Sequence, residues 1–213
     1  MARAPRPNVN DGIYHVGSRG VRRSPIYTDE VDYMRFRHLF ALVSRELGWI
    51  CHSSCQMPNH YHLVLETPEP NLSEGMHRLN WRYATWFNRR HGFTGHVFER
   101  RFYSDLVESN AHFLELARYV LLNPVRAHLC SHPREWRFST FRGPLSQRLL
   151  GQFGHEPALA RARFEAFVCQ GASGPVPVPG TGTRPDQPKP YVLAKRSASR
   201  RTRSAAGRPT TLR

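Results

Sequence analysis

The sequence contains no long hydrophobic run, and its N-terminal residues give no hint of secretion. No apolar segment approaches the about 20 residues that a helix needs to cross a bilayer, and the N-terminus lacks a charged segment followed by an apolar one. Only four cysteines occur among 213 residues, and no internal repeat is found. These absences argue against a membrane-spanning or a disulfide-rich secreted protein. We therefore expect a soluble cytoplasmic protein with reduced thiols.

Acidic residues are also scarce. The chain has 16 of them against 31 lysines and arginines, which leaves a formal net charge of +15. Such a surface attracts polyanions before any specific contact forms, so nucleic acid is the first candidate partner. Residues 171–213 contain nine of the basic residues and seven prolines but only one aromatic residue. This composition cannot bury enough apolar surface to offset the entropy of ordering, and it predicts a disordered, Pro-rich basic tail.

The apolar residues that are present recur with helical spacing in three segments. They repeat every three or four positions over 29–47, 72–89 and 110–123, and a proline closes the last segment. Asn71 and Glu74 resemble a capping box at the start of the second segment. The spacing predicts three helices, each with one buried face.

Segments rich in β-branched and aromatic residues predict the strands. They cover 13–16, 49–55, 60–66 and 95–109. The element order is then β, α, β, β, α, β, α. An antiparallel sheet covered by helices on one face satisfies this order with short connections, so we expect an α+β, ferredoxin-like (RNA-recognition-like) fold.

Two histidines stand one residue apart in the run MPNHYHLVLE, residues 57–66. Side chains of a strand alternate, so His60 and His62 project from one face while Tyr61 and Leu63 project from the other. Two imidazoles on one face can converge on a divalent ion. They can equally be structural residues of the strand, and the pair alone leaves both interpretations open.

A tyrosine and an amide share one face of the third helix. Tyr119 and Asn123 are separated by four residues and are offset from the apolar stripe. They could supply a nucleophile and a further ligand. On periodicity alone they could also be a half-buried surface tyrosine and a helix-ending residue before proline.

Four segments, taken in order, resemble one family. They are YHV…RG at 14–20, MPNHYHLVLETPEPNLSEGMHRLNWRYATWFNRRHG at 57–92, GHVFERRFYS at 95–104 and FLELARYVLLNPVRAHL at 113–129. Together they resemble the single-tyrosine HUH transposases, with the greatest similarity to the insertion-sequence 200-like and REP-associated tyrosine transposases. The resemblance extends through nearly all of 12–142.

The resemblance implies a role for each candidate. His60 and His62 match the metal-binding histidine pair, Tyr119 matches the nucleophile, and Asn123 stands where the family places a polar third ligand or metal-proximal residue. The implied cofactor is Mg²⁺ or Mn²⁺. The implied activity is cutting and rejoining of single-stranded DNA through a 5′-phosphotyrosine, on hairpins formed by palindromic repeats, with the protein associated with the nucleoid. Whether one chain or a homodimer completes the site is not implied.

The resemblance also suggests a domain division. We predict a catalytic domain over 1–142, a C-terminal helical extension over 143–170 with a helix at 157–168, and the basic tail over 171–213.

Arginines interleaved with aromatic residues such as Trp81 could bind phosphates while the rings stack on bases, although the aromatic residues also fit a core. Arg78, Arg82, Arg100 and Arg101 are interleaved in this way. The basic loop after the first strand could also contact phosphates, or it could be an ordinary solvated loop. The arginines predicted to contact DNA are therefore Arg19, Arg22, Arg23, Arg78, Arg82, Arg100 and Arg101.

Two alternatives compete with this interpretation. Cys51, Cys55, His60 and His62 could form a structural zinc site, although their spacing is unusual. A nucleic-acid-binding module of the same fold that no longer cuts DNA would have almost the same sequence.

Overall fold

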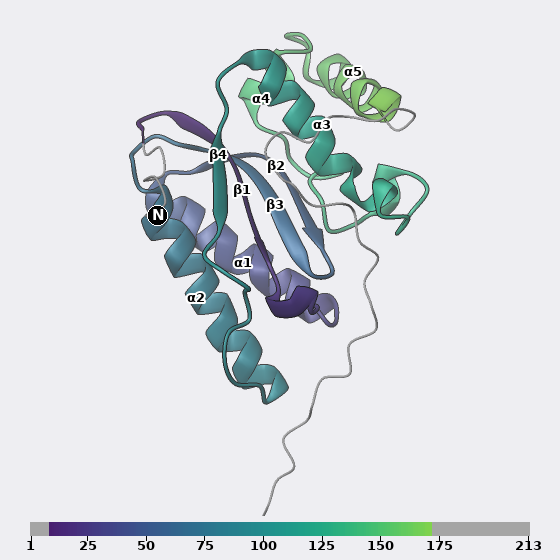
Figure 1. Ribbon diagram of the computed structural model, residues 1–213. Helices are drawn as coiled ribbons and strands as arrows, with labels where there is room; N and C mark the ends of the chain where they lie inside the picture. The colour runs from purple at the N-terminus through teal and green to yellow at the C-terminus, as the bar shows by residue number, and fades with distance from the viewer. Residues whose placement is uncertain (1–8, 172–213) are drawn as a thin grey trace, which may run out of the picture.

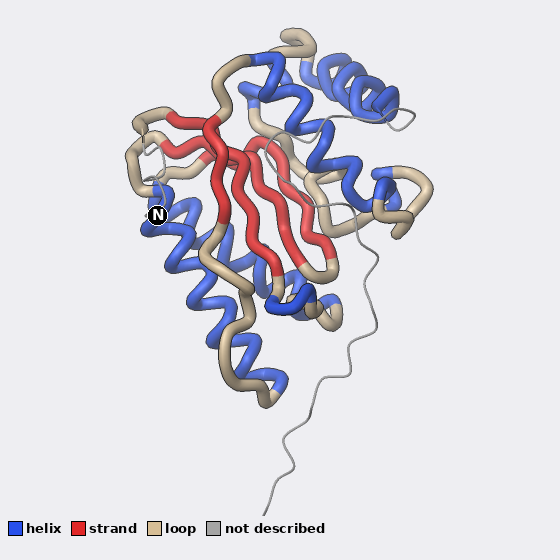
Figure 2. The backbone as a smooth tube through the Cα atoms, viewed as in Figure 1, coloured by secondary structure: helices blue, strands red, loops and turns tan. Residues whose placement is uncertain are grey.

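The computed structural model describes residues 9–171, which form one antiparallel sheet between two helical layers (Figures 1 and 2). The elements are β1 (Gly12–Arg19), η1 (Val21–Arg23), α1 (Glu30–Leu47), β2 (Ile50–Met57), β3 (His60–Thr67), α2 (Leu72–His91), β4 (Tyr103–Leu106), α3 (Asn110–Arg126), η2 (Pro133–Glu135), α4 (Gln147–Gly151) and α5 (Pro157–Gln170). The predicted order of strands and helices is confirmed. The predicted basic tail lies outside the described residues, apart from Gly171.

The four strands have the order β2-β3-β1-β4, and every pairing is antiparallel. This arrangement confirms the predicted α+β fold with a ferredoxin-like sheet. The two central strands, β1 and β3, pair along their full length from Gly12 opposite Thr67 to Arg19 opposite His60. This pairing therefore fixes the start of β3, at His60, beside the end of β1, at Arg19.

The helices cover both faces of the sheet, which differs from the expected single covered face. On one face α1 and α2 pack against Tyr14, Val16, Tyr61 and Leu63. On the other face α3 packs against β2 and β3, and α4 and α5 pack beside it (Figure 1). The sequence did not reveal this because the third helix has an apolar stripe like the other two, and a stripe does not specify which face it covers.

Local capping explains most helix boundaries. Asp29 caps α1 by accepting a hydrogen bond from the Asp32 backbone nitrogen, and Gly48 ends it with a left-handed φ of 69°. The capping box predicted for α2 is wrong. The Asn71 side chain instead accepts a hydrogen bond from Trp49 Nε1 at 2.6 Å and makes no cap contact.

Two further boundaries differ from those predicted. Pro124 lies inside α3 and the helix continues to Arg126, because proline removes only one backbone donor and the last turn can continue beyond it. Within the predicted strand at 95–109, only Tyr103–Leu106 forms a strand. The segment before it is a loop that contacts the end of β1 through an isolated bridge between Gly20 and Phe98.

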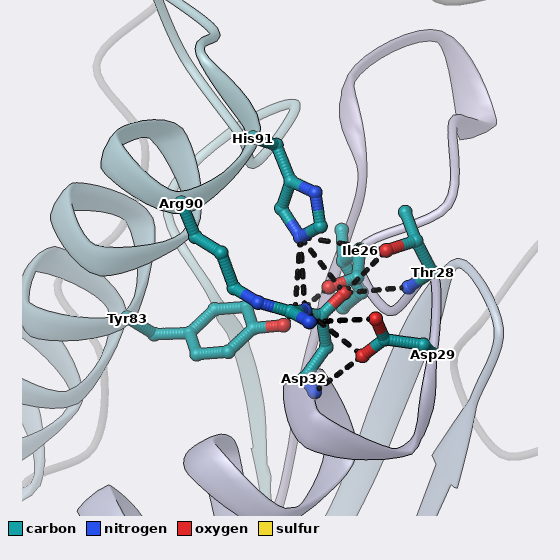
Figure 3. Close-up of polar contacts among 7 residues, drawn as sticks. All are labelled: Ile26, Thr28, Asp29, Asp32, Tyr83, Arg90 and His91. Carbon is teal, nitrogen blue, oxygen red and sulfur yellow. Dashed lines mark hydrogen bonds and ion pairs between the residues drawn. The ribbon is translucent and has the colours of Figure 1, made fainter.

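A buried carboxylate joins the ends of α1 and α2 (Figure 3). The Asp32 side chain is fully buried and accepts hydrogen bonds from the Thr28 backbone nitrogen and hydroxyl, both at 2.7 Å. Arg90 and His91, in the last turn of α2, also bind it. Arg90 in addition holds Asp29 at 2.7 Å, and this hydrogen bond lowers the pKa of the Asp29 carboxyl to about 2. The network fixes the two helices to each other on the face away from α3.

A second polar cluster joins the C-terminal helices to the sheet. Fully buried His52 on β2 contacts Glu66 at 3.1 Å and the Ser146 hydroxyl at 2.7 Å. Ser146 is the N-cap of α4, and Arg148 of that helix binds Glu66 at 3.2 Å. The predicted division between catalytic domain and extension stays a prediction.

In the part of the chain that the structure describes, no helix is long and apolar enough to cross a membrane.

Candidate active site

The two histidines of β3 lie on the face covered by α3. Strand alternation places Tyr61 and Leu63 in the core beneath α1 and α2, which turns His60 and His62 toward the opposite face. His62 is buried, and His60 is half-buried. Their ring centroids are 4.9 Å apart and the rings are nearly perpendicular. The predicted pair is therefore close in space at the end of a central strand.

Two residues that the sequence did not single out surround His62. His15 on β1 stacks on it, with its Nε2 3.0 Å from His62 Nδ1. The hydroxyl of Tyr103 on β4 lies 2.7 Å from the same nitrogen. Gly17 pairs with both His62 and Tyr103, and a side chain at this position would overlap the Tyr103 ring. The glycine thus makes room for the tyrosine to reach across β1 to the histidine.

Burial keeps the three imidazoles neutral at pH 7 in the absence of a bound ion. Desolvation, with a smaller contribution from His112, lowers the pKa of His15 to about 3. Desolvation and the charge of Arg19 lower the pKa of His60 to about 3. The pKa of His62 also falls well below its ordinary value, first through burial and then through its neighbours. A neutral imidazole retains the lone pair that a metal ligand needs.

Helix α3 brings Tyr119 against the histidines of the same chain. The Tyr119 ring is half-buried and lies edge-on to His62, with centroids 5.7 Å apart, and to His15 at 6.2 Å. The guanidinium carbon of Arg126, two turns further along α3, lies 5.5 Å from the Tyr119 ring centroid. The predicted nucleophile and the predicted metal pair are therefore adjacent.

Asn123 lies one turn beyond Tyr119 and is half-buried. Its amide nitrogen donates hydrogen bonds to the backbone oxygens of Tyr119 at 2.9 Å and Val120 at 3.5 Å. Because the nitrogen is held by the helix, the amide oxygen is the atom with which this side chain can serve as a ligand. Its role as a third ligand stays a prediction.

The donor set suits an ion held by two imidazoles and oxygen ligands. The described residues contain no group of three or more His, Cys, Asp or Glu side chains that could hold a metal ion. The zinc alternative therefore has no site in this part of the chain. Burial also raises the pKa of the Cys51 thiol to about 12 and that of Cys55 further, which opposes the thiolate form that zinc requires.

Five of the arginines predicted to contact DNA gather at one end of β1. Arg19 ends the strand opposite His60, and η1 follows it. The loop before β4 runs alongside, since the backbone nitrogen of Val21 donates to Val97 and that of Glu99 to Arg19, both at 2.9 Å. We call these five residues the basic rim: Arg19, Arg22, Arg23, Arg100 and Arg101.

The other two predicted arginines lie elsewhere. Arg78 and Arg82 are on the outer surface of α2, whose inner surface packs beneath the sheet on the face opposite the histidine pair. Glu46 of α1 binds Arg82 at 3.2 Å and Arg78 at 3.6 Å, and Glu74 also binds Arg78. Trp81, between them, has 62% of its surface exposed. The structure thus separates the predicted set into a group beside the histidines and a distant, partly neutralised pair.

Comparison with known proteins gives a family match and two structural matches. Residues 8–122 match the family model described as IS200-like transposase. A search of curated proteins finds no match. A REP-associated tyrosine transposase bound to a REP hairpin has 20% identity and a TM-score of 0.58, with 74% of this chain and 90% of that chain covered. A candidate transposase from Deinococcus radiodurans R1 has 17% identity and a TM-score of 0.40, over 56% of this chain and 95% of that one. The first structural match supports the fold, and the family match covers more than half of the sequence.

Proposed function

Because the chain belongs to the IS200-like transposase family, we propose that it cuts and rejoins single-stranded DNA with Tyr119 as its nucleophile. The observation that carries the proposal is the contact between α3 and β3, where the Tyr119 ring lies edge-on to His62 at 5.7 Å. A tyrosine, two neutral imidazoles and a basic rim occupy one end of the sheet. This combination suits attack on a phosphodiester in a nucleic acid.

The chemistry assigned to Tyr119 is one exchange of phosphate esters and its reversal. The phenol oxygen attacks phosphorus, the bond from phosphorus to the 3′ oxygen breaks, and the leaving oxygen takes up a proton to become a 3′ hydroxyl. The products are a 5′-phosphotyrosine and a free 3′ end. In the reverse direction a 3′ hydroxyl attacks the phosphotyrosine and releases the tyrosine, so rejoining needs no nucleoside triphosphate.

Tyr119 must lose its proton during the attack. A phenol has an ordinary pKa of about 10, so it is largely protonated at pH 7. Arg126 places a positive charge near the Tyr119 ring, where it can stabilise negative charge that develops during the attack. The same charge is available to the phosphate oxygens once the scissile bond is in place.

His60 and His62 are the residues that would hold a divalent ion, Mg²⁺ or Mn²⁺, and the amide oxygen of Asn123 is the proposed third protein ligand. When bound, such an ion neutralises charge on the oxygens of the scissile phosphate. The imidazoles are neutral before binding, so they do not have to release protons to become ligands. Burial of His62 among His15, Tyr103 and Tyr119 fixes its ring and excludes water from its inner side.

The proposed substrate is a single strand that forms a hairpin. Arg22, Arg23, Arg100 and Arg101 are exposed beside the histidine pair and can follow the phosphates of a strand that enters the site. The structurally similar REP-associated transposase is bound to a REP hairpin. We extend the hairpin class to this chain on the basis of the shared fold and the basic rim.

The test is covalent capture. The protein is incubated with labelled, hairpin-bearing single-stranded DNA and Mn²⁺ and then analysed on a denaturing gel. We expect an adduct with the parent protein and none with Tyr119→Phe or with the double variant His60→Ala/His62→Ala. Tyr33→Phe, altered in the core beneath the other face, is the matched control and should form the adduct.

An adduct that persists in Tyr119→Phe would show that Tyr119 is not the nucleophile. Binding of the hairpins without any adduct, over a panel of sequences, would instead favour a DNA-binding module that does not cut.

A further inference from the structure

The structure shows side chains that can fix the proton on each ring of the histidine pair. Asn59, directly before the pair, donates a hydrogen bond from its amide nitrogen to the Arg23 backbone oxygen at 3.1 Å. This contact assigns the orientation of the amide, because a carbonyl can only accept. The amide oxygen of Asn59 therefore faces His60 Nδ1, at 2.6 Å.

That orientation determines the tautomer of His60. An amide oxygen has no proton to give, so the proton in this hydrogen bond belongs to His60 Nδ1. A neutral imidazole carries only one such proton, and the lone pair is then on Nε2. Asn59 thus prepares His60 to bind an ion through Nε2.

For His62 the equivalent partners are His15 and Tyr103. Both lie at Nδ1 of His62, at 3.0 and 2.7 Å, and the Tyr103 hydroxyl is also 3.3 Å from His15 Nε2. One placement of the protons gives all three groups a hydrogen-bond partner and leaves the lone pair on Nε2 of His62 available for an ion. In it His62 Nδ1–H donates to the Tyr103 oxygen, and the Tyr103 hydroxyl donates to His15 Nε2.

We propose that Asn59, His15 and Tyr103 are positioning residues that hold His60 and His62 in the Nδ1–H tautomer, so that both Nε2 atoms are ready to bind one divalent ion. The inference rests on the proposed metal role of the two histidines. It assigns a function to three residues that the reaction itself does not use. His15 is 2% exposed, and a buried imidazole ordinarily requires a hydrogen-bond partner.

Metal affinity measured without DNA tests the proposal independently of activity. Partners of this kind typically contribute about 10-fold to 100-fold to metal affinity. We expect Asn59→Ala to weaken Mn²⁺ binding by about that factor, as measured by titration calorimetry. Asn59→Asp retains an oxygen acceptor toward His60, while it loses the donor to Arg23 and adds a negative charge, so its Mn²⁺ affinity should not fall as that of Asn59→Ala does.

The matched test for His62 removes its acceptors but keeps the rings. The double variant His15→Phe/Tyr103→Phe should bind Mn²⁺ about 10-fold to 100-fold more weakly than the parent, whereas Tyr103→Phe alone should lose less because His15 Nε2 can still accept. Thermal melting of each variant separates loss of fold from loss of affinity. Parent-like affinity in both Asn59→Ala and the double variant would overturn the proposal.

Nitrogen-15 NMR of the parent protein without metal gives a reading that needs no variant. The proposal requires the proton of the neutral His60 ring on Nδ1, and a proton on Nε2 would contradict it. A different result would count against the proposed function itself. If His60 and His62 do not bind a metal ion, the parent protein will bind Mn²⁺ no better than the double variant His60→Ala/His62→Ala does.

Discussion

The division of the predicted arginines into two groups leads to a quantitative prediction about DNA binding. We compare two triple variants that change the net charge equally. One is Arg22→Gln/Arg23→Gln/Arg101→Gln, which removes three exposed charges of the basic rim. The other is Arg45→Gln/Arg78→Gln/Arg82→Gln, which removes three charges from the α1 and α2 layer on the opposite face.

The expected effect follows from counterion release. Each phosphate neutralised on a single strand contributes about 0.7 to the slope of log K against log salt, so loss of three rim contacts should lower the slope by about 2. At 0.15 M salt the same relation corresponds to about 50-fold weaker binding. The control variant should keep the parent slope, because its charges lie across the molecule and are screened over about 8 Å at that ionic strength. Glu46 already balances part of the charge of Arg78 and Arg82.

Fluorescence anisotropy with a labelled single-stranded hairpin, at several KCl concentrations, measures both slopes. The measurement is made in a Tyr119→Phe background so that cutting does not change the probe. Equal losses of slope in the two triple variants would show that net charge, and not the basic rim, governs binding. A larger loss in the control would place the DNA on the α1 and α2 layer and refute the proposed path.

Two further predictions concern stability and metal preference. Asp32→Ala removes the buried partner of Arg90, and we expect it to lower the free energy of unfolding by about 3 kcal/mol, the low end for a broken buried ion pair, because Arg90 keeps Asp29. The control Glu30→Ala breaks an exposed ion pair and should lower the free energy of unfolding by at most about 1 kcal/mol. If urea denaturation shows an equally small loss for Asp32→Ala, the prediction is wrong. Adduct formation should reach half its maximum at a lower concentration of Mn²⁺ than of Mg²⁺, because imidazole is a poorer ligand for Mg²⁺. Saturation at lower Mg²⁺ in a metal titration of the capture assay would argue against ligation by the histidines.

The sequence predicted the elements better than their surroundings. Helix periodicity and strand alternation depend on the local chain, so α1, α2 and β3 appear within two residues of the predicted bounds. The face covered by α3 depends on which side of the sheet its connection crosses, and nothing in its apolar stripe encodes that. The same limit applies to the loop before β4, where aromatic and β-branched residues suggested strand but the chain passes the end of β1.

Parts of the site could be predicted only through resemblance to a family. Alternation placed His60 and His62 on one face, and helical spacing placed Tyr119 beside Asn123, but neither pattern brings the strand and the helix together. The position of His15 on the same face as the histidine pair could have been predicted from the sequence. Tyr14 and Val16 face the α1 and α2 core, so alternation alone puts His15 on the opposite face. The partner of that histidine is fixed by the pairing of β1 with β3, which is a long-range property.

The residues that stabilise the sheet also determine where its chemistry lies. Tyr61 and Leu63 hold β3 against α1 and α2, and the Tyr61 hydroxyl donates a hydrogen bond to Asn80 of α2 at 2.6 Å. A shift of β3 by one residue would exchange its two faces, which would bury the histidines under α1 and α2 and turn the apolar side chains toward Tyr119. The apolar face therefore fixes the register, and the register in turn presents His60 and His62 to α3. Substitutions at Tyr61 that weaken the packing of β3 against α1 and α2, without unfolding the protein, should therefore lower the affinity for the metal ion, although Tyr61 is not a ligand.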